Sequence, residues 1–283
     1  MVNYKIIKIM LDNEQGKVLK NTFNPEGSSL RLYQKRLFSI LCYIDGICTK
    51  YNITYWLSSG TCLGAVRHGG FIPWDDDLDI EMFEDDYRKF QEVMSKIDSK
   101  QYIFQTKKND PGYLHAFGKV RDLNSIIYEA HGKDSRYKYR GCYVDVFHLI
   151  PSNSIFLFRI ANNLKRREEK YNLSRNKTSS IVYHVTKCIN NISIPVIRLL
   201  SKLFNKKYYR HYYGTGYPYK RNIEEILPVK YANFEGKLFP IPQNADAYLR
   251  RMYGDYEKIP DIKTIKPHLV NYRFNDNSCV EMS

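Results

Sequence analysis

The amino-acid sequence predicts an α+β domain in which helices flank a mixed sheet and a basic helical segment is inserted. Two observations support this. Short runs with strand periodicity alternate with amphipathic helical runs in residues 1–150 and again in 222–283. Between them, residues 151–221 have a helical pattern and few turn signals. We therefore expect a core formed by the first part, an insertion at 151–221 and a C-terminal part that completes the core.

The predicted core starts with a helix over residues 30–52, where apolar residues recur at helical spacing and a serine can cap the first turn. A short strand at 55–57 and a turn of small residues at 58–61 follow, and a helix opens at Leu63. A loop at 67–73, marked by two glycines and a proline, leads to strict strand alternation at 77–82. The remaining elements are a helix at 85–97, strands at 102–105, 118–121, 125–129 and 142–149, a hairpin at 231–240 and a helix at 245–253.

Length and composition exclude several classes of protein. With 283 residues, 43% of them hydrophobic and 26% charged, the chain can bury a substantial core, which excludes a wholly disordered protein. Its apolar runs fall far short of the roughly 18 residues that suggest a transmembrane helix, and the first residues lack the apolar centre of a secretory signal. We expect a cytoplasmic protein, with at most peripheral contact with the inner face of the membrane. Six cysteines without a CxxC pair predict free thiols.

Positive charge is concentrated in one region. The formal net charge is +14, and residues 151–221 contain fifteen Lys or Arg against only Glu168 and Glu169. Within this segment the run Val196 to Lys206 is amphipathic with a basic side. We expect residues 155–210 to contact an anionic membrane or glycolipid; the alternative is a helix that packs its apolar stripe on the protein's own core.

The stretch from residue 75 to residue 82 carries the strongest chemical signal. A strand here would place Asp75, Asp77, Asp79 and Glu81 on one face and Leu78, Ile80 and Met82 on the other. Such crowded carboxylates repel one another unless a cation lies over them. Hard oxygen ligands favour Mg²⁺ or Mn²⁺ over Zn²⁺. A solvated strand face is the alternative.

Asp145 is a further candidate ligand or general base, because it lies between apolar Val144 and Val146 in a predicted strand. A carboxylate buried there without a partner would be costly. An edge-strand position that faces water is the alternative. Together with Gly60-Thr61 after a strand, which allows phosphate oxygens close to the backbone, the pair Asp77 and Asp79 is the pattern of a nucleotidyltransferase fold.

The full stretch Tyr55 to Ile80, including Arg67-His68-Gly69-Gly70-Phe71-Ile72-Pro73-Trp74, resembles the LicD family of phosphocholine transferases, whose core fukutin-related proteins share. Lys119-Val120-Arg121-Asp122, Tyr143 to Phe147 and Tyr253-Gly254-Asp255-Tyr256 resemble further family segments. The resemblance covers residues 30–150 and 222–260. Ser59 stands where many members have a second glycine.

This resemblance implies transfer of a phosphoalcohol, typically phosphocholine, from CDP-choline or another CDP-alcohol to a sugar hydroxyl, with release of CMP. The acceptor would be a cell-surface glycan such as lipopolysaccharide or teichoic acid, or a glycolipid precursor. Asp77, Asp79 and Asp145 would hold the metal or, for Asp145, take the acceptor proton. The expected substrate-binding residues are Gly60, Thr61, Arg67, His68, Asp75, Lys119 and Arg121.

Several of these residues have structural alternatives. Lys119 and Arg121 could be ordinary surface charges, and Arg67 could bond loop carbonyls. Trp56 and Trp74 could form an aromatic box for choline or pack in the core.

Two other functions fit parts of the sequence. Lys206 to Tyr213 interleaves basic and aromatic residues as single-strand binders do, and an RNA or small-molecule nucleotidyltransferase would share the metal pair. The acidic strand argues against a pure nucleic-acid binder, because it would repel phosphate. We therefore expect no nucleic-acid partner.

Overall fold

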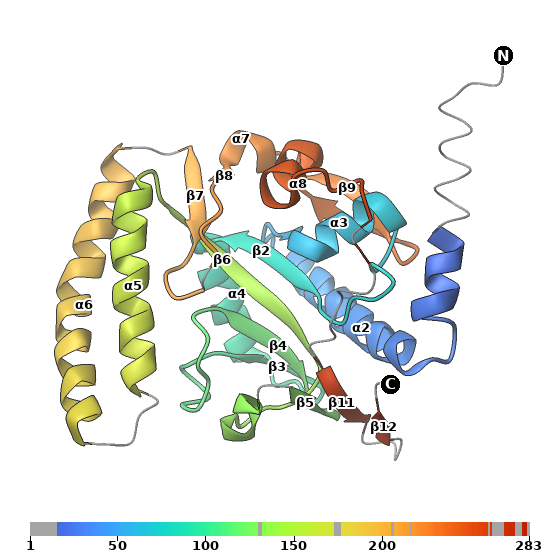
Figure 1. The fold of residues 1–283 in the computed structure, drawn as a ribbon, viewed down its shortest axis with the longest axis horizontal. Helices are drawn as coiled ribbons and strands as arrows, with labels where there is room; N and C mark the ends of the chain where they lie inside the picture. The colour runs from blue at the N-terminus through green and yellow to red at the C-terminus, as the bar shows by residue number, and fades with distance from the viewer. Residues whose placement is uncertain are drawn as a thin grey trace.

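The computed structural model describes residues 16–283, except 130–131, 173–176, 205–206, 216, 260, 262–268, 275–278 and 282–283. In this part of the chain, the centre of the molecule is a seven-stranded mixed sheet (Figure 1). Five strands form its main path, in the order β1 (Trp56–Leu57), β2 (Asp79–Phe83), β6 (Tyr143–Pro151), β4 (Gly118–Asp122) and β3 (Tyr102–Gln105). β7 (Tyr208–His211) pairs with the end of β6, and β8 (Arg221–Asn222) pairs with β7. β2 and β6 run parallel, whereas the other neighbours run antiparallel.

Two helices cover one face of this sheet. α2 (Ser29–Lys50) is capped by Ser28, whose side chain accepts a hydrogen bond from Arg31, and α4 (Glu84–Lys96) follows β2 directly. Both pack on β3, since Tyr43 of α2 contacts Tyr102 and Phe90 of α4 contacts Phe104. The apolar residues Ile80 and Met82 of β2 are fully buried. The acidic residues that alternate with them in β2 therefore point to the opposite face.

That opposite face is covered by α3 (Ser59–His68), which packs on β2, on α8 (Ala245–Tyr253) and on the hairpin of β9 (Lys230–Phe234) and β10 (Lys237–Ile241). The short α7 (Ile223–Ile226) lies against α8. A three-stranded sheet at one edge joins β5 (Ser125–Glu129), β11 (Leu269–Phe274) and β12 (Cys279–Glu281), and a 3-10 turn, η1 (Lys133–Arg136), follows β5. The C-terminal part thus packs both on α3 and on α2, where Phe38 contacts Phe234 and Phe239 and Tyr33 contacts Tyr272.

The basic segment forms a helical hairpin of α5 (Ile155–Asn172) and α6 (Lys177–Phe204), which lie side by side at one end of the molecule (Figure 1). A small core of its own joins the hairpin to β6 and to the segment after β7; its buried members are Ile150, Phe158, Ala161, Ile194, Ile197 and Tyr213. None of the described helices combines the length and hydrophobicity needed to cross a membrane.

The α+β fold with a mixed sheet and flanking helices is confirmed. Several strand boundaries shift by one or two residues, and the shift that matters for the site is that β2 begins at Asp79, with residues 75–78 approaching it as a loop. Residues 208–211 and Arg221, which the sequence assigned to the helical segment, belong to strands β7 and β8 of the sheet instead. The three-part division stays a prediction. Five cysteines (Cys42, Cys48, Cys62, Cys142 and Cys188) are free thiols, whereas the side chain of Cys279 lies outside the described set.

The approach of α3 to the loop that follows it depends on Gly64. A Cβ atom at this position would lie 2.5 Å from the Gly70 carbonyl oxygen and 3.2 Å from the Ile72 nitrogen. Because both neighbours are backbone atoms, Gly64→Ala should lower the free energy of unfolding by about 1–3 kcal/mol in urea titrations. The matched control is Gly46→Ala in α2, where a Cβ would meet nothing within 4 Å and alanine should stabilise the helix by about 0.5–1 kcal/mol. Equal effects of the two substitutions would contradict the close contact.

Candidate active site

The parallel pairing of β2 with β6 brings two of the expected carboxylates together. Asp79 and Asp145 are register partners, and the Asp145 amide donates a hydrogen bond to the Leu78 carbonyl at 2.9 Å. Burial raises the pKa of Asp79 well above its usual value, and the neighbouring charges of Asp77, Asp145 and Asp75 raise it further. Lys119 opposes this effect. Four of the predicted acidic residues therefore share one site.

Lys119 reaches this site from β4, where it is the register partner of Asp145. Its Nζ lies 2.6 Å from Asp145 Oδ1 and 3.3 Å from the ring centroid of Tyr143, and its side chain is almost completely buried. The structure thus places Lys119 as a counter-charge to Asp145, which differs from an ordinary surface lysine.

Arg121, two residues farther along β4, is fully buried and does not belong to the described lining of the cavity at the carboxylates. Its Nε donates to Gln105 Oε1 and its Nη1 to the Gly141 carbonyl, both at 2.7 Å. The structure therefore gives Arg121 a place in the packing of β3 and β4.

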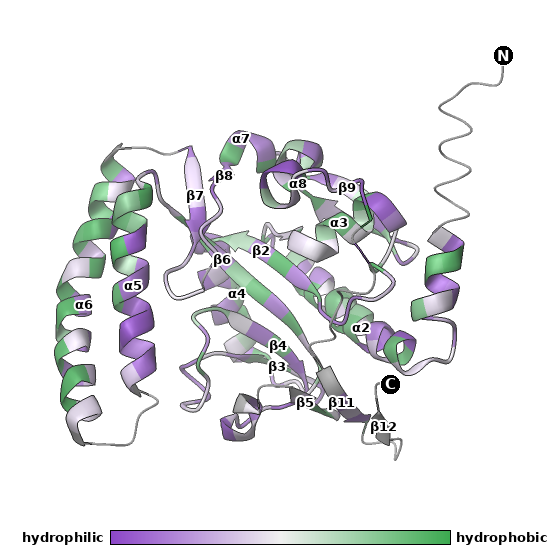
Figure 2. Ribbon diagram, viewed as in Figure 1, coloured by the Kyte–Doolittle hydropathy of each residue, from purple (hydrophilic) through white to green (hydrophobic). Residues whose placement is uncertain are grey.

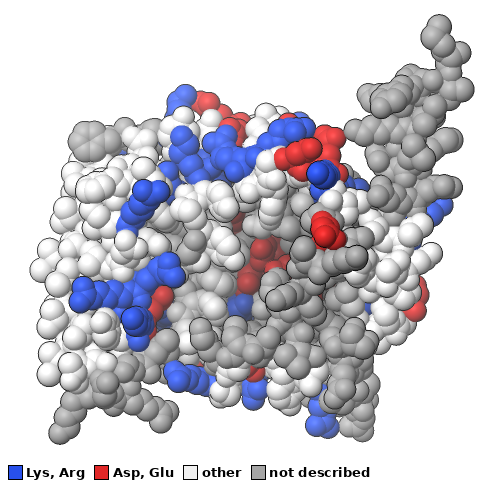
Figure 3. Space-filling view, viewed as in Figure 1, with Lys and Arg blue, Asp and Glu red and all other residues white. Residues whose placement is uncertain are grey.

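The acidic residues open into a cavity of about 570 Å³. Figure 3 shows acidic side chains in the hollow at the middle of this face. The wall is formed by residues that come from distant parts of the chain: Ser59, Gly60, Leu63, Ile72, Asp75, Asp77, Asp79, Phe147, His211, Tyr217, Pro218, Tyr219, Arg221, Met252 and Tyr253. Burial raises the pKa of Tyr217 and Tyr253, and Asp79 raises both further, so these two phenols lie close to the carboxylates.

The start of α3 forms the other side of the cavity. A Cβ atom at Gly60 would lie 2.9 Å from Asp75 Oδ2, so glycine allows this carboxylate to approach the first turn of the helix. Thr61 acts differently, since its buried hydroxyl accepts a hydrogen bond from the Asp79 amide at 2.8 Å and so positions the start of β2. Ser59 has φ = 47°, a left-handed conformation that glycine adopts more readily.

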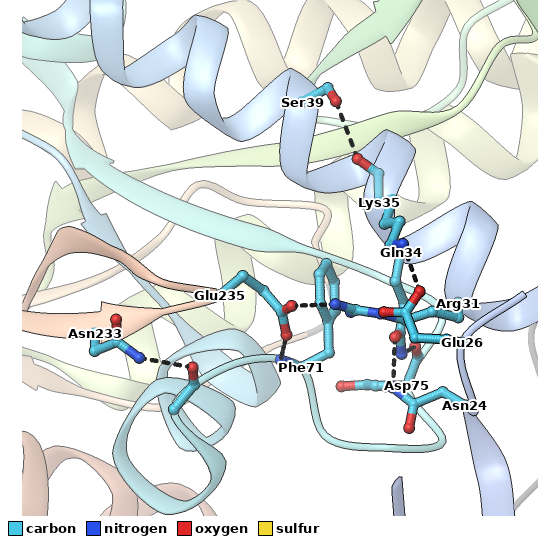
Figure 4. Close-up of polar contacts among 11 residues, drawn as sticks. Asn24, Glu26, Arg31, Gln34, Lys35, Ser39, Phe71, Asp75, Asn233 and Glu235 are labelled. Carbon is cyan, nitrogen blue, oxygen red and sulfur yellow. Dashed lines mark hydrogen bonds and ion pairs between the residues drawn. The ribbon is translucent and has the colours of Figure 1, made fainter. Parts of the chain in front are cut away.

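Asp75 is positioned by a loop that is fastened from two sides (Figure 4). From α2, Gln34 Nε2 donates to the Asp75 carbonyl at 2.9 Å. From the turn between β9 and β10, the Glu235 carboxylate accepts from the Phe71 amide at 3.1 Å and pairs with Arg31 of α2 at 2.6 Å. Asn233 adds a bond to the Gly69 carbonyl. Residues 69–75 are therefore held as part of the domain.

Arg67 and His68 end α3 and do not belong to the described lining of the cavity. Arg67 Nη1 donates to the Tyr256 carbonyl at 2.6 Å, and its Nε lies 3.0 Å from His68 Nε2. Burial, aided by the positive charge of Arg67, lowers the pKa of His68 to about 4, so the imidazole is neutral at pH 7. This arrangement matches the alternative in which Arg67 bonds backbone carbonyls.

Neither tryptophan lines the described cavity. Trp56 is fully buried and donates its indole N–H to Glu81 at 3.0 Å, whereas Trp74 packs edge-on against Phe23 with ring centroids 5.5 Å apart. Aromatic rings at the cavity come instead from Phe147, Tyr217, Tyr219 and Tyr253.

Glu81 departs from the expected open acidic face, because it is fully buried in a network of its own. Its carboxylate lies 2.6 Å from both His211 Nε2 and Arg221 Nη2, and it accepts from Tyr248 at 3.1 Å. Burial alone would raise the pKa of Glu81, but Arg221 and His211 outweigh it and hold the pKa well below its usual value. Burial and the charge of Arg221 lower the pKa of His211.

His211 and Arg221 are the main residues that sequence reasoning missed. They lie more than 120 positions after Glu81 on two short strands, and the basic and aromatic run that contains His211 suggested nucleic-acid binding instead. Tyr253 could have been found from the sequence, since it is the first residue of the Tyr253-Gly254-Asp255-Tyr256 segment that resembles the family.

The central strands of the mixed sheet carry paired carboxylates, and these lie beside a helix whose first turn contains Gly60-Thr61. This arrangement defines a domain of the nucleotidyltransferase type. A family model described as "LicD/FKTN/FKRP, nucleotidyltransferase domain" matches residues 52–174. The resemblance to the LicD family is thereby confirmed for residues 52–174, which match the nucleotidyltransferase domain of that family.

Individual relatives agree with this assignment. The lipopolysaccharide cholinephosphotransferase LicD of Haemophilus influenzae is 26% identical over 264 residues, which cover 85% of this chain and 96% of that protein. The human ribitol 5-phosphate transferase FKRP is 31% identical over 68 residues, 22% of this chain and 14% of that protein. The human ribitol-5-phosphate transferase FKTN is 33% identical over 85 residues, 30% of this chain and 16% of that protein.

The buried pair of Glu81 and Arg221 gives a test of the network. Arg221→Met should lower the free energy of unfolding at pH 7 by about 3–5 kcal/mol, because it leaves a buried carboxylate without its main cation. Burial then raises the pKa of Glu81, so stability returns as a proton binds Glu81 or His211 at lower pH. The loss measured by urea unfolding should therefore be smaller at pH 5 than at pH 8.

The control is Lys207→Met, which removes the exposed partner of Glu224 and should change stability little at either pH. A loss for Arg221→Met that is the same at pH 5 and pH 8 would contradict the account of Glu81.

Proposed function

We propose that this chain is a metal-dependent phosphotransferase that moves a phosphoalcohol, with phosphocholine as the first candidate, from a CDP-activated donor to a hydroxyl of a cell-surface glycan or its lipid-linked precursor. CMP would leave. The observation that carries the proposal is the convergence of Asp75, Asp77 and Asp79 at one cavity beside the start of α3, with Asp145 next to Asp79 on the adjacent strand. The relatives named as transferases of phosphocholine and ribitol 5-phosphate support the reaction class.

The donor set fits a hard divalent cation. Asp77, Asp79 and Asp145 offer only oxygen ligands, and the raised pKa of Asp79 reflects burial and negative charge that a cation would compensate. Among the described residues, no three His, Cys, Asp or Glu side chains already stand as a ready metal site, so binding would draw these carboxylates together. When bound, Mg²⁺ or Mn²⁺ would neutralise charge on the donor pyrophosphate as the bond to CMP breaks.

The other residues have roles that follow from their positions. The first turn of α3, with Gly60, offers partial positive charge to donor phosphates. Lys119 holds Asp145 in place through its 2.6 Å ion pair, so that Asp145 can join the metal site or accept the proton of the acceptor hydroxyl. Thr61 and Gln34 position Asp79 and Asp75 through the backbone.

Phosphocholine is favoured over a polyol phosphate by the aromatic lining. Tyr217, Tyr219 and Tyr253 share the cavity with the carboxylates, and a quaternary ammonium group is attracted both to aromatic faces and to negative charge. A panel of CDP-choline, CDP-ethanolamine, CDP-ribitol and CDP-glycerol, with CMP release as the readout, tests this choice. CMP release from CDP-ribitol alone would overturn it.

Nucleotidyl transfer from a nucleoside triphosphate is the alternative reaction, and pyrophosphate release would reveal it. Nucleic-acid binding through Lys206 to Tyr213 has less support. Arg210, His211 and Tyr213 are buried in the described structure, so the alternation of basic and aromatic residues does not form a surface there, and Lys206 lies outside the described residues.

Asp77→Asn and Asp79→Asn should each reduce transfer by about 10³-fold or more, because each removes a negative ligand with little change in size. CMP release at saturating Mg²⁺ and circular dichroism would be measured together. Chelation should stop the wild-type reaction, and Mg²⁺ or Mn²⁺ should restore it.

The matched control is Asp98→Asn, an exposed aspartate after α4. It should retain wild-type turnover. Near wild-type turnover of either cavity variant would show that the metal assignment is wrong.

A further inference from the structure

The outer side of α6 carries a continuous apolar stripe. Its members follow one another at spacings of three or four residues, so they lie on one side of the helix, and each is between 45% and 71% exposed. We call this set the α6 stripe; it consists of Ile181, Val185, Ile189, Ile192, Val196, Leu199 and Leu203. Figure 2 shows this hydrophobic helix at the outer edge of the molecule. Soluble monomers rarely expose a contiguous apolar row of this extent without a function for it.

The α6 stripe does not pack on the protein's own core. The buried residues of α6 lie on the opposite side of the helix: Ser179, Thr186, Asn190, Ile194, Ile197 and Ser201. Asn190 bonds the Leu164 carbonyl and Glu168 of α5, and Ile194 and Ile197 join the small core with Phe158. These contacts fix the rotation of α6 about its axis, so the stripe must face outward. The alternative in which Val196, Leu199 and Leu203 pack on the core is therefore excluded.

Positive charge accompanies the α6 stripe. The exposed cations of the hairpin include Arg159, Arg166, Arg167 and Lys170 on α5 and Lys202 on α6. The hairpin's two acidic residues are already paired, Glu168 with Lys165 at 2.9 Å and Glu169 with Lys107 at 2.8 Å. Figure 3 shows basic side chains gathered beside the largely uncharged outer edge. The exposed charge of this end of the molecule is therefore positive.

Charge decides which partner suits this surface. The four-and-three spacing would also allow a second copy of the chain to pair along α6. Two hairpins, however, would bring their cations together, and neither has a free carboxylate in the hairpin to offset them. A bilayer with anionic headgroups instead supplies an apolar layer for the stripe and negative charge for Lys202 and the α5 cations.

We propose that α6 lies in the interface of an anionic membrane, with the α6 stripe inserted among the acyl chains and the exposed cations of the hairpin attracted to the headgroups. This inference goes beyond the proposed transfer reaction and does not depend on it, because membrane binding is measured without donor or acceptor. Its consequence is a fixed orientation, in which the hairpin holds the domain at a lipid surface.

The test is flotation of the full chain with vesicles of phosphatidylcholine alone and of an equal mixture of phosphatidylcholine and phosphatidylglycerol. The protein should float with the mixed vesicles and stay at the bottom with the neutral ones. The double variant Ile192→Ser with Leu199→Ser should weaken binding to the mixed vesicles at least about tenfold, because it removes two inserted side chains. Arg167→Gln with Lys202→Gln should also weaken binding, and added salt should have less effect on this variant.

The matched control is Tyr231→Ser with Leu238→Ser, which changes two similarly exposed apolar side chains on the β9–β10 hairpin. It should bind as the wild type does. Thermal unfolding of all variants checks that the fold is kept. This is expected because all the substituted side chains, apolar and cationic, are exposed.

Three results would overturn the proposal. The first is absence of flotation with the mixed vesicles at low salt. The second is flotation that the Ile192→Ser and Leu199→Ser variant retains in full, which would show headgroup attraction without insertion. The third is a wild-type protein that does not float but forms a dimer in solution, combined with loss of this dimer in the Ile192→Ser and Leu199→Ser variant. This result would show that the stripe binds a second copy of the chain.

Discussion

The neutralisation of negative charge along β2 is the constraint on which the rest of the structure depends. On one face this central strand carries the half-buried Asp79 and the fully buried Glu81, and an unpaired buried carboxylate costs several kcal/mol. Arg221 of β8 pairs with Glu81, and Lys119 of β4, which pairs with Asp145, opposes the negative charge around Asp79. The sheet therefore has to include β7 and β8, and the chain has to return to it after the helical hairpin.

The two carboxylates of β2 are treated differently, and this difference separates stability from chemistry. The Glu81 carboxylate is within bonding distance of four partners, so its charge is stabilised inside the protein. These partners are Arg221, His211, the indole N–H of Trp56 and the hydroxyl of Tyr248. Asp79 is surrounded by Asp75, Asp77 and Asp145, with Lys119 as the opposing charge. A cation-dependent reaction requires such uncompensated negative charge at a cavity. A structural ion pair, in contrast, neutralises its own charge. Alternate residues of one strand thus serve two purposes.

Much of the fold follows from local pattern. The helix predicted over 245–253 matches α8, and the strands predicted at 102–105 and 125–129 match β3 and β5, because periodicity and capping act over a few residues. The cluster of Asp75, Asp77 and Asp79 was visible because these residues lie within five positions of one another, although residues 75–78 form a loop and not the predicted strand. His211 and Arg221 were not, since their roles depend on side-chain contacts with Glu81 across 130 and 140 residues, which no local pattern indicates. Glu81 was placed correctly on the same strand face as Asp79, but its environment is set by those distant partners.

The way the helical hairpin is attached has a consequence for how this domain can vary. Pro151, the last residue of β6, is the register partner of Tyr209 in β7, so the two ends of the hairpin leave from adjacent antiparallel strands. Such partners lie only about 5 Å apart, a gap that a tight turn can close. The pairing of β6 with β7 therefore does not depend on the length of the chain between them. A lengthened, shortened or exchanged hairpin leaves the pairing of His211 and Arg210 with β6 geometrically possible, so this segment can diverge rapidly while the carboxylate site stays constant.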